Sequence, residues 1–241
     1  MPFQNSTAEE VAEHFKDQIR GQNILVTGAS LNGLGAAFLK AIAPYSPGLL
    51  VLAGRSHKAL AESEAELLKE TPGLKTRLLI VDFASLDSVR KAAAEVLAYD
   101  EKITISVMNA GVMMTPEGKT ADGIETQFGV NHVGPFLFTN LLLEGATKPA
   151  PPRSVIVSSM AQIYMADGIN FDQPGYFNGQ KDTYGKIESY AQSKAANVLF
   201  AAALHRRGWE AVSLHPGVIA TGLVRHMTDQ DYRDAGQSTV T

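Results

Sequence analysis

Six short, continuous apolar runs recur along this chain, and each has the length of a strand rather than that of a helix. Runs of this kind are typical of strands buried on both faces, as in parallel sheets. They cover residues 23–27, 49–53, 77–81, 103–108, 154–157 and 210–214. Helical patterns separate them, at residues 36–43, 59–69, 86–98, around 127–132 and at 188–200. This alternation predicts an α/β fold, a doubly wound parallel sheet of six strands between two layers of helices.

Length and composition fit one domain that spans residues 1–241. A chain of 241 residues, 45% of them apolar, can bury one sizeable core. Residues 1–20 predict a packing helix, with Thr7 as its N-cap and Glu10 completing a capping box. We find no internal repeat, low-complexity tract or linker in the sequence.

Charge and residue usage exclude several classes of function. The net charge is −4 and no basic stripe is present, so we expect no nucleic-acid partner. The chain has no cysteine, and its six histidines are scattered, so we expect no metal site. No apolar run approaches the ~20 residues of a membrane span, and the first residues lack the layout of a signal peptide. These features predict a cytoplasmic protein.

A glycine-rich turn follows the first strand directly and leads into a helix. It contains Gly28, Gly33 and Gly35. In this context glycines allow a tight turn and a close approach to a pyrophosphate, which meets the free N–H groups of the helix. The turn predicts a dinucleotide site, and plain loop chemistry is the alternative. Further contacts in the turn are predicted for Thr27, Ser30 and Leu34.

The end of the second strand bears on the choice of dinucleotide, since ligands bind at the carboxyl ends of strands in such sheets. Arg55 and Ser56 follow this strand, where NAD-binding proteins usually place an acid. A guanidinium there suits a 2′-phosphate. We therefore expect NADP (NADPH) in preference to NAD, and a solvated arginine is the alternative.

The third and fourth strands also end in candidate contacts. Asp82 and Phe83 follow the third strand, and the carboxylate either accepts a hydrogen bond from an adenine amino group or caps the next turn. Asn109, Ala110 and Gly111 follow the fourth strand. These small residues let the backbone lie close to a flat ligand.

Tyr190 and Lys194 form a candidate acid/base pair. They lie four residues apart in a helical pattern, and therefore on one face of the helix. A phenol has a pKa near ~10, and a nearby ammonium group lowers that pKa toward neutral pH. The preceding dinucleotide turn favours this interpretation over an ordinary surface pair.

Three other polar positions lie at strand ends or in apolar surroundings. Asn131 lies in an apolar helical pattern and needs partners, either in a structural hydrogen bond or in a polar relay. Ser158 and Ser159 end the fifth strand, and residues 215–221 follow the sixth.

Together these motifs resemble the short-chain dehydrogenase/reductase family, from about residue 22 to residue 221. The matching residues are Thr27-Gly28, Gly33, Gly35, Asn109-Ala110-Gly111, Asn131, Ser158-Ser159, Tyr190, Lys194 and Pro216-Gly217. The sequences that begin at Asn131 and Ala191 are most similar to retinol-dehydrogenase-like members, including fungal reductases. The resemblance implies a Rossmann fold and an NADP-dependent oxidoreductase that interconverts a carbonyl and an alcohol, often as a homodimer or homotetramer.

The resemblance also implies catalytic roles. Tyr190 would be the general acid/base, and Lys194 would lower its pKa and hold the nicotinamide ribose. Ser159, rather than Ser158, would bind the substrate oxygen. Asn131 would hold a water that links Lys194 to solvent.

Near the nicotinamide, the resemblance implies contacts from residues that follow the sixth strand. Thr221 and the backbone around Ile219, after Pro216 and Gly217, would fix the carboxamide. Only a short tail follows Thr221, so we expect the usual seventh strand and final helix to be missing and residues 222–241 to be an incomplete C-terminal segment. The glycine turn is also one residue longer than the commonest spacing.

Residues 160–189 form a predicted insertion on the substrate side. Its apolar residues favour an apolar small molecule as substrate, and coverage of the sheet is the alternative. They are Met160, Ile163, Tyr164, Met165, Phe171, Tyr176 and Phe177.

Three other functions stay open at this point. The fold can hold a cofactor as a sensor or scaffold without catalysis, or it can pack against a second copy in an assembly. An epimerase or dehydratase is a third possibility, although those enzymes usually carry a larger C-terminal substrate domain.

Overall fold

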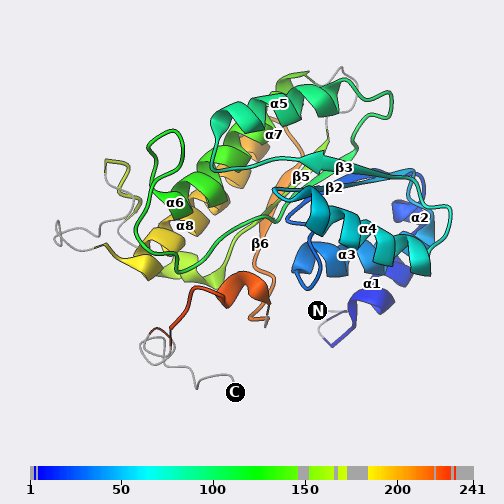
Figure 1. Cartoon of the computed structure of the whole chain (residues 1–241), viewed down its shortest axis with the longest axis horizontal. Coiled ribbons are helices and arrows are strands. Elements are labelled where there is room, and N and C mark those ends of the chain that lie inside the picture. The colour runs from blue at the N-terminus through cyan, green and yellow to red at the C-terminus, as the bar shows by residue number, and fades with distance from the viewer. Residues whose placement is uncertain are drawn as a thin grey trace.

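The computed structural model describes residues 3, 5–145, 152–165, 168–172, 184–219, 221–228 and 231. Its six strands form one parallel sheet in the order β3-β2-β1-β4-β5-β6, which confirms the predicted doubly wound arrangement (Figure 1). The strands are β1 (Asn23–Thr27), β2 (Leu49–Gly54), β3 (Thr76–Ile80), β4 (Ile105–Met108), β5 (Arg153–Val157) and β6 (Ala211–Leu214). The order reverses between β1 and β4, which places a crevice at their carboxyl ends.

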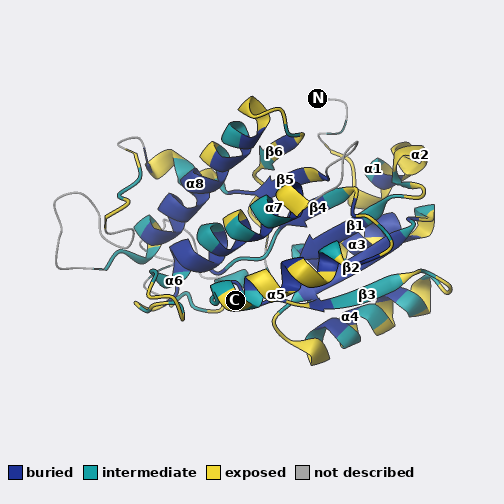
Figure 2. Cartoon of the chain, turned by 90° about the horizontal axis from the view of Figure 1, so that it is seen from above, coloured by how far each residue is buried: buried dark blue, intermediate teal, exposed yellow. Residues whose placement is uncertain are grey.

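Helices cover both faces of the sheet, as the alternating pattern predicts. They are α1 (Ala8–His14), α2 (Lys16–Ile19), α3 (Leu34–Ile42), α4 (His57–Glu70), α5 (Leu86–Leu97), α6 (Thr126–Phe128), α7 (Gly134–Gly145) and α8 (Lys186–Arg206). One apolar cluster joins α1, α3 and α4 to one face, and a second joins α5, α7 and α8 to the other. Figure 2 shows the buried strands β1 and β2 between these layers.

The N-terminal segment differs from the single predicted helix. The capping box forms as expected: Glu10 N donates to Thr7 Oγ1 at 3.2 Å, and Thr7 N donates to Glu10 Oε2 at 2.9 Å. The helix ends at His14, because Phe15 has φ −99° and ψ 16° and packs its ring against those of Phe3 and His14. A second short helix, α2, begins after it.

The two edge strands are less buried than the sequence pattern predicts. Every position of β2 up to Ala53 is buried, whereas Ile80 in β3 is 43% exposed and Leu214 in β6 is 42% exposed. An edge strand has a neighbour on one side only, which explains the difference. Within the described residues the sheet ends at β6.

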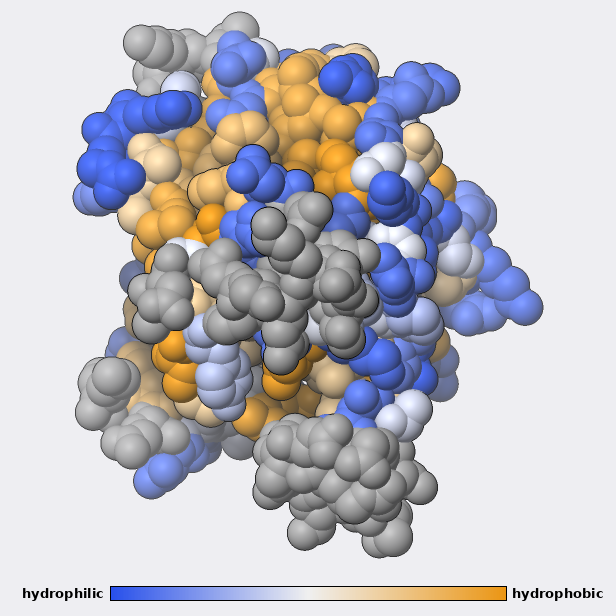
Figure 3. Space-filling model, turned by 90° about the vertical axis from the view of Figure 1, so that its left-hand side faces the viewer, coloured by the Kyte–Doolittle hydropathy of each residue, from blue (hydrophilic) through white to orange (hydrophobic). Residues whose placement is uncertain are grey.

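The outer surface of α7 and α8 carries large apolar side chains, among them Phe136 and Leu199. Figure 3 faces the left-hand side of Figure 1 and shows apolar surface in its upper part, bordered by hydrophilic residues. Among the residues described, no helix combines the length and the apolar character that a membrane crossing requires.

Candidate active site

A cleft of about 520 Å³ opens at the carboxyl ends of β1, β2, β4 and β5. Most of the residues predicted to bind a cofactor line it, together with the catalytic pair on α8. These residues are Gly28, Ser30, Gly33, Leu34, Arg55, Ser56, Phe83, Asn109, Ala110, Gly111, Tyr190, Lys194, Pro216 and Thr221. The predicted residues that do not line it are Thr27, Gly35, Asp82, Asn131, Ser159, Gly217 and Ile219.

The glycine turn forms one wall of the cleft and leaves no space for side chains at two positions. Gly28 has φ 70°, and a Cβ there would lie 2.9 Å from Ala110 Cα. A Cβ on Gly35 would lie 2.5 Å from Gly28 O. The N-terminus of α3 begins inside this turn, and no side chain caps it. A wall of backbone with free N–H groups fits the pyrophosphate of a dinucleotide.

Thr27 and Asn109 support the turn from beneath. Thr27 Oγ1 accepts hydrogen bonds from the backbone N–H groups of Asn109 and Ala110, each at 3.0 Å. Asn109 Nδ2 donates to Thr27 O at 2.8 Å and to Gly28 O at 3.3 Å. Asn109 therefore ties the turn to the end of β4, a role beyond the small size that the sequence analysis assigned to it.

The ends of β2 and β3 differ in how they meet the cleft. Arg55 is exposed and lines the cleft, and Ser56 accepts a hydrogen bond from Ala59 N at 3.3 Å as the N-cap of α4. Asp82 Oδ1 accepts a hydrogen bond from Ala84 N at 2.9 Å. Of the two interpretations of Asp82, the structure shows the cap of the next turn, while its neighbour Phe83 reaches the cleft.

Tyr190 and Lys194 lie on the buried face of α8, at 6% and 4% exposure. Lys194 Nζ donates to Val157 O at 3.1 Å and lies 5.6 Å from the centre of the Tyr190 ring. The side chains of Tyr190 and Ser159 share a hydrogen bond. Ser158 Oγ instead donates to the backbone oxygen of Lys194 at 2.7 Å. Ser159 is therefore the serine that contacts the phenol.

Burial controls the protonation of both groups. It raises the pKa of Tyr190, and the hydrogen bond from Ser159 acts in the opposite direction. Burial also lowers the pKa of Lys194 to about 8. The net direction for the pKa of Tyr190 is upward because removal of the phenol from water dominates, and the lowering of that pKa by the Lys194 ammonium group stays a prediction.

Asn131 lies in a π-helical segment, Gly129–Val133, between α6 and α7. Its Oδ1 accepts from Val112 N at 2.7 Å, and its Nδ2 donates to Val112 O at 2.8 Å and to Ser193 Oγ at 3.0 Å. These bonds match the structural interpretation of a buried Asn. π-Helical turns occur often at functional sites, which is compatible with the water relay that the family resemblance implies. That relay stays a prediction.

Asn197 is a buried residue beside the candidate site that the sequence analysis did not single out. Its Nδ2 donates to Val157 O at 3.2 Å and to Asn131 O at 3.1 Å. Its Oδ1 lies 3.0 Å from His132 Nδ1. Asn197 thus shares the carbonyl acceptor of Lys194 and holds the π-helical segment. Asn197 lies three residues after Lys194, and therefore on the same face of α8. That spacing is the sequence signal that could have identified it.

Other lining residues escaped the sequence analysis because apolar or small side chains carry no chemical signature. They are Leu31, Asn32, Gly54, Val81, Val112, Val130, Val157, Gly222 and Leu223, with Arg225 as the charged exception.

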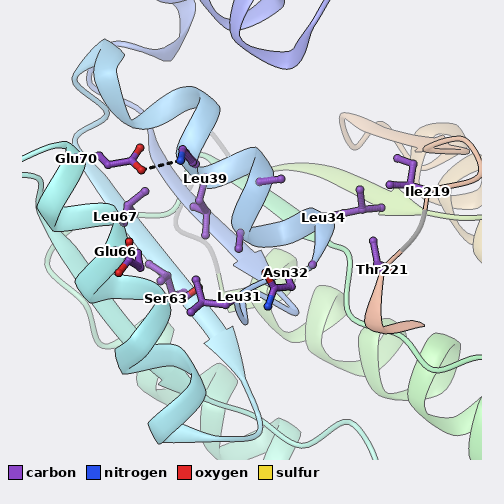
Figure 4. Close-up of a pocket in the computed structure, with 15 residues that line it drawn as sticks. Leu31, Asn32, Leu34, Leu39, Ser63, Glu66, Leu67, Glu70, Ile219 and Thr221 are labelled. Atoms are coloured by element: carbon purple, nitrogen blue, oxygen red, sulfur yellow. Dashed lines mark hydrogen bonds and ion pairs between the residues drawn. The ribbon is translucent and has the colours of Figure 1, made fainter. Parts of the chain in front are cut away.

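A second cavity, of about 560 Å³, lies on the other side of the glycine turn, between α3 and α4 (Figure 4). Leucine side chains line it, and Lys40 pairs with Glu70 at 2.6 Å on its rim. Ile219 lines this cavity and not the cleft, and the predicted contact of its backbone with the nicotinamide carboxamide stays a prediction. The chain after Gly217, which has φ 93°, runs toward the start of α3. The residues that border both cavities are Leu31, Asn32, Gly33, Leu34 and Thr221.

The described part of the insertion after β5 does not line the cleft. Met165 is buried against Ala191 and Ala195 on α8. The other described apolar residues are exposed, namely Met160, Ile163, Tyr164 and Phe171. Tyr176 and Phe177 lie outside the described residues.

Known proteins share both the sequence and the fold of this chain. Residues 22–170 match the family described as short chain dehydrogenase. Human retinol dehydrogenase 13 is 39% identical over 215 residues, which cover 88% of this chain and 63% of the relative. Oxidoreductase fscI of Fusarium equiseti is 32% identical over 238 residues, which cover 87% of this chain and 92% of the relative.

Among solved structures, a short-chain dehydrogenase from Sphingobium yanoikuyae in complex with NADPH has a TM-score of 0.67 and 20% identity. The match covers 91% of this chain and 77% of that one, and it shows the shared fold. The protein is therefore a doubly wound α/β protein with a dinucleotide-type cleft. It belongs to the short-chain dehydrogenase family.

Proposed function

We propose that this protein is an NADP-dependent oxidoreductase that interconverts a carbonyl and an alcohol. The observation that carries the proposal is that Tyr190 and Lys194 line a cleft whose other wall is the glycine turn, with Ser159 hydrogen-bonded to Tyr190. The names of the relatives, a retinol dehydrogenase and an oxidoreductase, support the same class of reaction.

The cleft has groups suited to each part of an NADP molecule. The backbone of residues 28–35 would hold the pyrophosphate, Arg55 and Ser56 the 2′-phosphate, and Lys194 the hydroxyls of the nicotinamide ribose. A bound nicotinamide would supply or accept the hydride.

The protein's own residues position the substrate and move its proton. Ser159 and Tyr190 hold the substrate oxygen between their hydroxyl groups. Because burial raises the pKa of Tyr190, its phenol stays protonated at neutral pH and donates its proton to the oxygen during reduction. In the reverse direction the phenolate accepts the proton of the alcohol.

Thermal unfolding with NADP(H) and NAD(H), titrated separately, tests the cofactor. A ligand that binds only the folded state adds about 2.7 kcal/mol of stability at a hundred times its Kd. We expect NADPH to raise the melting temperature at lower concentration than NADH. The same shift with both would refute the preference for NADP, and no shift with either would refute the dinucleotide site.

Replacement of the Tyr190 hydroxyl tests the chemistry. Tyr190→Phe should lower turnover by roughly 10²–10⁴-fold, the usual contribution of a general acid/base. NADPH oxidation with a panel of apolar aldehydes and ketones gives the rates. Tyr45→Phe, in the 3-10 turn after α3, is the control and should keep the wild-type rate. A Tyr190→Phe enzyme with wild-type turnover would rule out this role. NADPH binding without turnover of any carbonyl would favour the sensor or scaffold.

Substrate class, location and assembly complete the proposal. The name of the relative, retinol dehydrogenase 13, supports an apolar small molecule as substrate. Phe136 and Leu199, 42% and 57% exposed on α7 and α8, support a homodimer or homotetramer through these helices. Light scattering after size-exclusion chromatography tests the assembly, and cell fractionation tests the predicted cytoplasmic location.

A further inference from the structure

A second arginine lines the dinucleotide cleft, from a segment far from the glycine turn in sequence. Arg225 follows the short 3-10 helix Gly222–Val224, and it borders the same cleft as Arg55 and Ser56. One guanidinium thus comes from the end of β2 and the other from the segment after β6. The sequence analysis assigned a phosphate contact to the first only.

The two arginines lie close enough to act on one imidazole. The pKa of His226 is lowered first by burial, then by the charges of Arg225 and Arg55. Arg225 precedes His226 in the chain, and Arg55 lines the same cleft as Arg225. Among the described side chains, no carboxylate pairs with either arginine.

Hydrogen bonds hold the Arg225 segment at both ends. Thr221 Oγ1 accepts from Leu223 N at 3.3 Å. Farther along, Asp231 accepts from Thr228 N at 2.7 Å and pairs with Lys186 of α8 at 3.2 Å. Between them, Arg225 Nη1 donates to Gly222 O at 2.9 Å. A guanidinium has five N–H donors, so Arg225 keeps four for a ligand.

We propose that Arg225 and Arg55 form a two-armed clamp for the 2′-phosphate of NADP, with Arg225 as a specificity-determining residue. The inference rests on the proposed function, since it deepens the choice of cofactor at the same cleft. Two like charges gathered without a carboxylate repel each other, and a phosphate dianion between them removes that repulsion. Guanidinium groups also match the geometry of phosphate oxygens.

The position of the pair favours the 2′-phosphate over the pyrophosphate. Arg55 and Ser56 directly follow β2, where the ribose hydroxyls of a dinucleotide lie in this fold. The pyrophosphate belongs at the glycine turn, whose backbone already offers N–H groups. Arg225 lines the same cleft as Arg55 and Ser56, and we therefore assign it to the ribose end.

Binding of NADPH and NADH to Arg225→Gln tests the clamp by isothermal titration calorimetry. Loss of one charged hydrogen-bond partner should weaken NADPH binding roughly 10- to 100-fold. NADH has no 2′-phosphate, so its Kd should stay within about twofold of wild type. Arg20→Gln is the matched control: Arg20 is exposed before β1, at the opposite end of the sheet, and its replacement should change neither Kd.

If Arg225→Gln weakens the binding of NADPH and of NADH equally, Arg225 contacts the pyrophosphate and the clamp is overturned. Unchanged binding of NADPH would also overturn the clamp. The double variant Arg55→Gln/Arg225→Gln sharpens the result, because two groups on one phosphate give non-additive losses. Strictly additive losses would place the arginines on separate groups and also contradict the clamp. A wild-type protein that binds neither dinucleotide would refute the proposed function itself, which distinguishes the two failures.

Discussion

Lys194 is a buried ammonium group that donates a hydrogen bond to the carbonyl oxygen of Val157. Burial lowers its pKa from 10.5 to about 8, because water solvates the charge better than the protein interior does. Below pH 8 the folded protein must therefore hold an unfavourable charge. A cofactor or substrate that contacts this group would offset part of that cost.

This burial makes stability depend on pH in a defined direction. Between pH 8 and 10.5 the unfolded chain binds the Lys194 proton and the folded chain does not, so the free energy of unfolding rises with pH in that window. Lys194→Met removes the effect. At pH 7 the variant should gain up to roughly 3 kcal/mol over wild type, and the gain should shrink as the pH rises above 8.

Urea unfolding of both proteins at pH 7, 8.5 and 9.5 measures the difference. Lys58→Met, at an exposed position in the first turn of α4, serves as the control and should keep the wild-type pH dependence. A Lys194→Met protein that is less stable than wild type by the same amount at every pH would show that packing, not charge, decides this position.

The unit of β1, glycine turn and α3 depends on one close contact between two backbones. Gly35, in the first turn of α3, lies against the carbonyl of Gly28, and Asn109 donates to that same carbonyl. Any side chain at Gly35 pushes α3 away from the strand. The element that presents N–H groups to the cleft is therefore set by the absence of a Cβ.

Gly35→Ala should separate α3 from the turn. Its Cβ would lie 2.5 Å from Gly28 O, so we expect a loss of about 1–3 kcal/mol in the free energy of unfolding, typical of overpacking. NADPH binding should also fall at least tenfold. Gly33→Ala is the graded comparison, since its Cβ would lie 3.3 Å from Ser30 O, and it should lose less stability. Equal losses at both positions would argue against a specific contact at Gly35.

At the scale of the whole molecule, the cleft lies at the carboxyl ends of the central strands. Within the described residues, β6 is the last strand on one side of the sheet. Val212 and Leu214 on β6 are 40% and 42% exposed. An exposed apolar edge strand can pair with the edge of another chain.

A charge on this edge should therefore reduce self-association. Val212→Lys should lower light scattering at high protein concentration and leave NADPH binding unchanged, because β6 position 212 lies away from the cleft. Lys is tolerated on edge strands, where its head stays in water. Val155→Lys on the neighbouring strand β5 is the contrasting variant, and it should destabilise the fold. Unchanged association of Val212→Lys would show that β6 is not the contact.

Local sequence patterns were sufficient for the fold class and for part of the site. Buried strands and amphipathic helices produce a characteristic spacing of apolar residues over a few neighbouring positions. The glycine turn and the Tyr190–Lys194 spacing are equally local. These features were readable because each depends on residues a few positions apart. The Thr7 capping box and the six strands were predicted for the same reason.

Only tertiary structure decided the features that join distant segments. Asn109 meets Thr27 across 82 positions, and Asn197 meets Asn131 across 66. The same holds for Arg225, which shares a cleft with Arg55. Burial, which sets the pKa values of Tyr190 and Lys194, likewise depends on how strands and helices pack. The hydrogen-bond partners and the solvation of a group depend on how the core packs. The sequence therefore identifies the chemical groups, and tertiary packing determines what each group contacts.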